Sequence, residues 1–209
     1  MVEGHRHGRV PRAVRREQLL DNAERLFIDH GYGGFSIEDL CRASGVSRPI
    51  VYEYFGSKDG VFLACIERIR LEFEDHMMQA AAPATSVVEA LRLGATAFFT
   101  ILERDPGRWS LVYGGTTVLA GDMADQLLDL RAQTVERIAD IGRKFAPGAD
   151  EMRVLAYAHA VSGSGEQLGR WWLRNRTISQ DQLVEYHCAF AESALSKLVT
   201  NGSPARVQR

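Results

Sequence analysis

The segment from Ser47 to Lys58 concentrates side chains that bond to phosphates and to the edges of nucleotide bases. Arg48 can donate two hydrogen bonds at once to the O6 and N7 acceptors of guanine, so we expect it to contact a base. Hydroxyl and phenol groups bond phosphate oxygens as readily as bases. No paired acid, base or nucleophile accompanies them, so the chemistry is recognition rather than catalysis. The outward residues of the expected helix are Ser47, Arg48, Pro49, Tyr52, Glu53 and Tyr54.

Two short helices joined by a glycine-containing turn must position these side chains. Ser36 is an expected N-cap with acidic residues in the turn after it, and its helix ends near Ser44. Ser47 caps the next helix, which has a proline in its first turn. A longer amphipathic helix over residues 12–30 precedes both. This spacing predicts a helix-turn-helix whose second helix, residues 47–55, can lie in a DNA major groove.

A larger set of residues agrees with a known pattern in order and spacing. It consists of Phe27, Gly31, Tyr32, Ser36, Ile37, the Gly45-Val46-Ser47 turn, the run from Val51 to Phe55, and Ser57-Lys58-Asp59. The stretch from Arg15 to Cys65 therefore resembles the DNA-binding domain of TetR-family transcriptional regulators. The resemblance implies a homodimer with an all-helical ligand-binding domain, and it does not extend residue by residue past about Arg70.

The resemblance also implies roles for individual residues. Tyr52 and Tyr54 would contact the phosphate backbone, and Lys58 would make a further phosphate contact. Ser36 would set the N-terminus of its helix against a phosphate, where free N–H groups favour an anion. The commonest family pattern differs at Pro49, so the bases read here do not follow from the family.

The net charge alone does not indicate a nucleic-acid partner. The chain has 209 residues with 25 Lys and Arg against 27 Asp and Glu, and its first 60 residues hold nine of each sign. Five arginines fall within residues 1–16, which predicts a basic arm over residues 1–11 that follows the minor groove or the DNA backbone. A solvated arm without DNA contacts is the alternative.

Helical spacing continues to the end of the chain, and no period-2 alternation bounded by hairpin turns occurs. The expected fold is all-α, with about nine helices. The expected divisions are the arm, a helix-turn-helix domain over residues 12–58, a ligand-binding and dimerisation domain over 59–200, and a disordered tail over 201–209.

Aromatic and polar side chains on the middle helices have the character of a small-molecule site, an apolar cavity with a few polar groups. Ordinary core packing is the alternative. The ligand is expected to be small and largely apolar, and to change the distance between the two recognition helices. The expected wall residues are Phe98, Trp109, Tyr113, Met123, Tyr157, Ser162 and Glu166.

The last two long helices have apolar stripes too wide for a single surface, which predicts a four-helix dimer interface. The residues assigned to it are Leu155, His159, Leu183, His187, Phe190, Ala191 and Ala194.

Other function classes find little support. The histidines and the three cysteines lack metal-ligand spacing, so no metal or cofactor is expected. The longest apolar run is about half of the roughly 20 residues needed to cross a bilayer, so we expect a cytoplasmic protein without membrane contact. The leading hypothesis is a homodimeric regulator, most simply a repressor, on a pseudo-palindromic operator. An all-helical carrier with a purely structural helix-turn-helix, or a helical enzyme using the same cavity, are the rivals.

Overall fold

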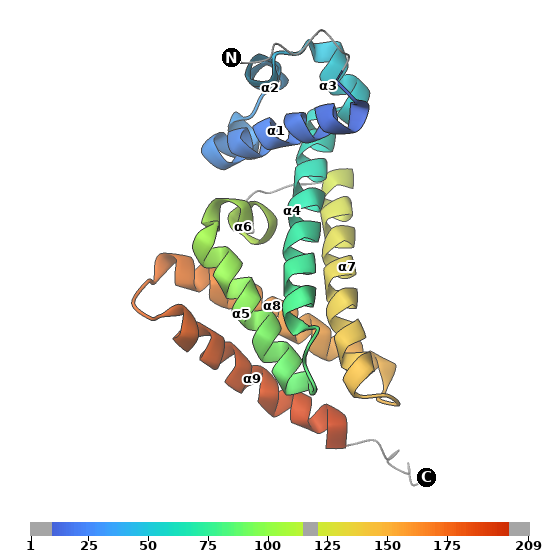
Figure 1. Cartoon of the computed structure of the whole chain (residues 1–209), viewed down its shortest axis with the longest axis vertical. Helices are drawn as coiled ribbons and strands as arrows, with labels where there is room; N and C mark the ends of the chain where they lie inside the picture. The colour runs from blue at the N-terminus through green and yellow to red at the C-terminus, as the bar shows by residue number, and fades with distance from the viewer. Residues whose placement is uncertain (1–9, 115–120, 201–209) are drawn as a thin grey trace, which may run out of the picture. The chain divides into compact units, whose positions relative to one another are not determined.

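The computed structural model of the chain describes residues 10–114 and 121–200, with side chains as far as Glu192. All regular structure in these ranges is helical, which confirms the all-α prediction (Figure 1). Nearly all of the predicted arm and the whole predicted tail lie outside the described residues. The helices are α1 Arg12–Gly34, α2 Ile37–Ser44, α3 Arg48–Phe55, α4 Lys58–Ala81, α5 Val87–Arg104, α6 Pro106–Tyr113, α7 Asp122–Phe145, α8 Glu151–Arg174 and α9 Gln180–Thr200.

The chain divides into two compact units, Met1–Arg68 and Ile69–Arg209. The division falls inside α4, later than the expected boundary at Lys58, because the first turns of α4 pack with α1. Val61 and Cys65 in those turns are fully buried.

Unit 1 is built around α1. Leu19, Leu20 and Phe27 on its inner face are buried, and the Phe27 ring stacks on Phe35 with 4.0 Å between ring centroids. The sequence predicts an end near Gly31, and Gly31 does leave helical geometry at φ +66°, but the helix resumes and runs to Gly34.

An arginine near the end of unit 1 ties α4 to α1. The Arg68 guanidinium donates to Glu24 at 2.7 Å, to Asp21 at 2.8 Å and to Glu17 at 2.9 Å. Glu24 is buried, so its carboxylate depends on this partner.

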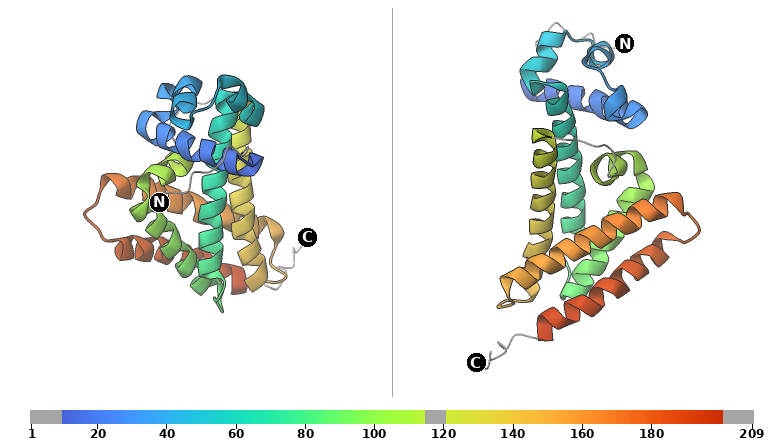
Figure 2. Two further views of the ribbon diagram at one scale, coloured as in Figure 1. Left: turned by 45° about the horizontal axis from the view of Figure 1, so that its top comes forward. Right: turned by 180° about the vertical axis from the view of Figure 1, so that it is seen from behind.

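Unit 2 packs α5, α6, α8 and α9 around one apolar core. Its largest fully buried side chains include Phe99, Leu102, Trp109 and Leu183. Helices α8 and α9 are antiparallel and lie side by side (Figure 2). A capping box opens α9, since the Ser179 N–H donates to Gln182 Oε1 at 3.0 Å and the Gln182 N–H donates to Ser179 Oγ at 3.2 Å.

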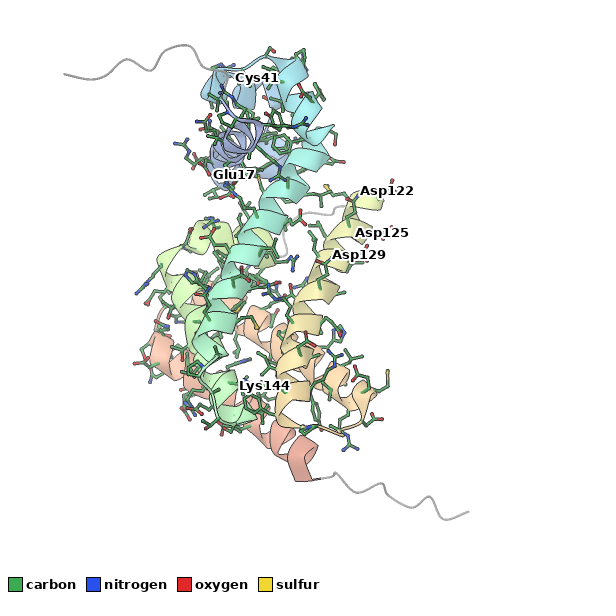
Figure 3. The ribbon with its side chains drawn as sticks, turned by 45° about the vertical axis from the view of Figure 1, so that its right-hand side comes forward. Glu17, Cys41, Asp122, Asp125, Asp129 and Lys144 are labelled. Atoms are coloured by element: carbon green, nitrogen blue, oxygen red, sulfur yellow. The ribbon has the colours of Figure 1, made fainter. Side chains whose placement is uncertain are left out.

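Helix α7 pairs with α8 and shows a clear division of faces. Asp122, Asp125 and Asp129 lie along one side of its first half (Figure 3), and all three are exposed. Thr134 and Val135 are buried on the opposite face. The first two carboxylates also lie near the helix N-terminus, where the macrodipole favours negative charge.

Candidate functional site

Helices α2 and α3 form the predicted helix-turn-helix. Ser36 caps α2 as predicted, since its Oγ accepts from the Asp39 N–H at 3.1 Å. Gly45 ends α2 at φ +63°, a left-handed conformation that glycine adopts without strain, and the chain turns directly into α3.

Most residues of α3 that the sequence predicts to face outward are exposed. Val51 is its one fully buried side chain. Ser47, Arg48 and Pro49 are exposed, and Tyr52 keeps 44% of its surface accessible. These side chains therefore lie on the surface of unit 1, where base edges and phosphates can reach them.

Arg48 has a partner that sequence reasoning missed. Its guanidinium forms an ion pair with Glu38 of α2, with 2.6 Å between Nη2 and Oε1. The two side chains are 57% and 49% exposed, so solvent screens the pair and its net stabilisation is small. A base can therefore replace Glu38 at modest cost.

Tyr54 is less accessible than predicted. It is half-buried, and the Arg12 guanidinium lies over its ring at 5.2 Å from the centroid. Arg12 also pairs with Glu53 at 3.7 Å. Arg12 is thus a further cation beside α3. Its place in the arginine-rich N-terminal segment was the sequence signal that could have identified it.

Lys58 and Ser36 both have structural partners. The Lys58 ammonium donates to the Phe35 carbonyl at 2.8 Å and lies 4.6 Å from the centroid of the Tyr32 ring. Burial and then the hydrogen-bonded Asp59 carboxylate raise the pKa of Tyr32 to about 12. The Ser36 hydroxyl donates to Asp39 Oδ2 at 2.6 Å, which lowers the pKa of that carboxyl. Phosphate contact by either residue has to coexist with these bonds.

Unit 2 contains a cavity of about 130 Å³. Five of the seven predicted wall residues line it: Phe98, Tyr113, Tyr157, Ser162 and Glu166. Most of the remaining wall is apolar, including Met77, Leu91, Ile138, Val154 and Val161. Helix α4 contributes Glu74, Met77 and Met78.

The other two predicted wall residues, Trp109 and Met123, do not line the cavity, so their assignment is wrong. Trp109 is fully buried in the core behind the wall, because it packs against Phe98 and Tyr113 at 5.8 Å and 5.3 Å between ring centroids. Met123 is buried near the start of α7 and does not line the cavity.

Two buried carboxylates in the wall are already paired. Glu74 accepts from Arg70 at 2.7 Å, from Arg137 at 2.9 Å and from the Thr134 hydroxyl. Sequence reasoning missed this cluster, because its α4 members and its α7 members lie about 60 residues apart along the chain.

Glu166 is paired in the same way. It accepts from Arg131 at 3.1 Å and from Ser162 at 3.2 Å, and Arg170 lies 3.5 Å away. Neither carboxylate is an unpaired charge, so the wall is polar at these points without a free anion.

The predicted dimer residues separate into two groups. Leu183, His187 and Ala191 are buried inside the protomer, so their assignment to the dimer surface is wrong. His187 lines the cavity instead, and burial lowers its pKa to about 4.

The other residues are not buried within the protomer, as far as the described side chains extend. His159 and Phe190 are exposed, Leu155 is half-buried, and Ala194 lies beyond the described side chains. Three further large side chains on these helices are exposed and were missed: Met152 and Trp171 on α8, and Tyr186 on α9.

Two kinds of feature are absent from the described residues. No helix there is long and apolar enough to span a bilayer. No three His, Cys, Asp or Glu side chains of those residues are grouped so that they could hold a metal ion.

Comparison with known proteins gives consistent matches. The family described as "Bacterial regulatory proteins, tetR family" matches residues 19–65, which include all of α2 and α3. The transcriptional activator FasR of Mycolicibacterium smegmatis is 30% identical over 195 residues, covering 92% of this chain and 89% of FasR. The transcriptional repressor ComR of Escherichia coli is 37% identical over 82 residues, 39% of each chain. Bacillus subtilis FadR, solved in complex with stearoyl-CoA, has a TM-score of 0.67 and 18% identity over 90% of this chain and 99% of its own.

Proposed function

Because the chain belongs to the TetR family of bacterial transcriptional regulators, we propose that it binds a pseudo-palindromic operator as a homodimer and leaves it when an effector occupies the unit 2 cavity. Its place of action is the cytoplasm, where operator DNA lies. The two recognition helices of the dimer would read half-sites about 34 to 36 Å apart, or a multiple of that distance.

The exposed face of α3 is the observation that carries this proposal. Ser47, Arg48, Pro49 and Tyr52 face solvent, although an all-helical carrier would have no use for such a surface. The rival reading, in which the helix-turn-helix is purely structural, leaves this face unexplained. The named relatives are transcriptional regulators, and we propose no enzymatic role.

The apolar face of α8 and α9 supports the homodimer. Met152, Trp171, Tyr186 and Phe190 are large side chains that one protomer leaves in water. Large apolar side chains left in water favour an interaction surface, and a second copy would bury them in a four-helix interface.

The cavity supports an effector with an apolar body. FadR of similar fold binds stearoyl-CoA, whose long chain is also apolar. The volume of the cavity here is closer to the roughly 150 Å³ that holds benzene in an engineered protein, so we propose a small compound. The flexible side chains of Met77 and Met78 can move and enlarge the cavity somewhat.

Helix α4 provides a route from effector to DNA. It lines the cavity through Glu74 and its two methionines, and the same continuous helix begins at Lys58 in unit 1. An effector that displaces the α4 wall would move the start of that helix. A coupling of about 1 to 3 kcal/mol changes operator affinity 5- to 150-fold.

Repression is the expected effect on transcription. Activation is a second candidate, because FasR, a relative matched over most of the chain, is an activator. A reporter under the bound promoter, in cells with and without the protein, distinguishes them: expression falls for a repressor and rises for an activator.

A gel shift tests the central proposal. The protein is titrated against the DNA upstream of its own gene and against random DNA at two salt concentrations. We expect a preference for the upstream DNA, and a loss of about 1 to 3 kcal/mol per half-site in Arg48→Ala. Arg104→Ala, an exposed arginine of unit 2, is the control. An undiminished preference in Arg48→Ala contradicts the assignment of α3 as the reading helix.

Light scattering at micromolar concentration tests the dimer. Phe190→Glu should give monomers, whereas Leu128→Glu, an equally exposed apolar side chain on α7, should remain dimeric. A monomeric wild-type protein refutes the assembly.

A further inference from the structure

One hydroxyl in the cavity wall lacks a partner. Tyr113 lines the cavity and is only 5% exposed, yet its OH has no hydrogen-bond partner among the described residues. Buried phenol groups usually find a partner, because an unsatisfied one loses its bond to water without replacement. Tyr113 therefore needs a bonding partner that the described part of the chain does not supply.

The ring of Tyr113 is held in place by its neighbours, so its hydroxyl has a fixed position. The Phe98 ring contacts it edge to face, with 5.3 Å between ring centroids. The Trp109 ring is tilted against it, also with 5.3 Å between ring centroids. Burial, and then the charge of Glu74, raise the pKa of Tyr113. The hydroxyl is thus protonated at neutral pH and is available as a donor.

The Glu74 carboxylate, whose charge acts on Tyr113, accepts no hydrogen bond from its hydroxyl. Glu74 already takes hydrogen bonds from Arg70, Thr134 and Arg137. The other buried side-chain atoms without a partner in the described residues are Arg70 Nε and Trp109 Nε1. Both of these are donors, so this part of unit 2 has a surplus of donors over acceptors.

We propose that Tyr113 is the polar anchor of the effector, and that the effector is a small apolar compound with one oxygen acceptor of the carbonyl or carboxylate type. This inference rests on the proposed function, in which the cavity of unit 2 is the effector site. The acceptor bonds the Tyr113 hydroxyl, and the apolar body lies against Leu91, Ile138 and Val161. The cavity volume limits that body to about one six-membered ring.

Calorimetric titration of the full-length protein with three shape-related probes tests the anchor. Acetophenone carries a neutral carbonyl, benzoate a carboxylate, and ethylbenzene no acceptor. We expect at least one oxygen-bearing probe to bind about tenfold tighter than ethylbenzene, the difference that one buried hydrogen bond makes. The order of acetophenone and benzoate then identifies the head group as neutral or anionic.

The variant Tyr113→Phe should abolish this preference and leave ethylbenzene affinity unchanged. Tyr157→Phe, a second tyrosine of the same wall, should keep it. An intact preference in Tyr113→Phe, or an equal loss in both variants, overturns the anchor. If none of the probes binds the wild-type protein, the assigned size and chemistry of the effector are wrong, whereas the gel shift still tests DNA binding separately.

A thermal melt of the unliganded protein provides an independent measurement. Because the hydroxyl has no partner among the described residues, Tyr113→Phe should melt at the same temperature as the wild type or higher. A clearly lower melting temperature would mean that the hydroxyl is already bonded in the free protein, and would overturn the inference.

Discussion

Replacing Glu38 by glutamine should strengthen operator binding. In the free protein the Arg48 guanidinium is paired with the Glu38 carboxylate at 2.6 Å, and this pair has to break before Arg48 bonds a base. Exposed pairs of this kind contribute about 0.2 to 1 kcal/mol. A dimer breaks two of them, so Glu38→Gln should bind about twofold to thirtyfold tighter.

Fluorescence anisotropy with labelled operator measures the effect. Removing a carboxylate also reduces repulsion from phosphates, so the same substitution is made in an Arg48→Ala background, where no pair exists to break. The part of the gain that comes from the broken ion pair should disappear there, and the whole gain should shrink at high salt, which screens exposed charges. If folded Glu38→Gln binds no tighter than wild type, or gains as much without Arg48, the pair does not restrain Arg48.

Two glycines one turn apart on α8 should respond oppositely to alanine. A Cβ at Gly169 would lie 2.6 Å from Trp109 Cζ2, so Gly169→Ala should lose about 1 to 3 kcal/mol to overpacking, against a helix-propensity gain of about 1 kcal/mol. At Gly165 the nearest atom is His187 Cε1 at 3.5 Å, so Gly165→Ala keeps the gain and should melt higher than Gly169→Ala; equal melting temperatures would contradict this packing. Acid should destabilise the protein through His187, because its folded-state pKa is about 4 against about 6.5 when unfolded. The unfolded chain therefore binds the proton first, and stability present above about pH 6.5 is lost as the pH falls toward 4, by about 2 kcal/mol between pH 7 and pH 5. Urea unfolding midpoints measured at both pH values should show this loss of stability in the wild type and much less of it in His187→Gln. Identical losses in the two proteins would mean that the His187 side chain is exposed to water.

Local signals allowed the helix-turn-helix to be predicted closely. The N-cap at Ser36, the left-handed Gly45 and the first-turn proline of α3 each follow from the chemistry of one or two adjacent residues. The capping box at Ser179 is of the same kind. Such signals need no knowledge of distant parts of the chain.

The faces of α9 could not be predicted for the opposite reason. Apolar side chains lie around much of this helix, and periodicity does not show which of them neighbouring helices cover. Packing against α5 and α8 buries Leu183 and His187, whereas Tyr186 and Phe190 remain outside. Trp109 shows the same limit, because composition does not separate a core aromatic from one that lines a cavity.

The attachment of α4 to α1 has a mechanical consequence. Within unit 1, Lys58 fastens the first residue of α4 to the end of α1, and Arg68, about 15 Å further along the helix, fastens it to three carboxylates of the same partner. Because α4 is attached at these two points, it resists tilting relative to α1. Under the proposed function, a tilt or rotation of α4 caused by an effector would therefore move unit 1 as a whole. The proposed dimer would then respond by a change in the distance between its two recognition helices, without a distortion inside either unit 1.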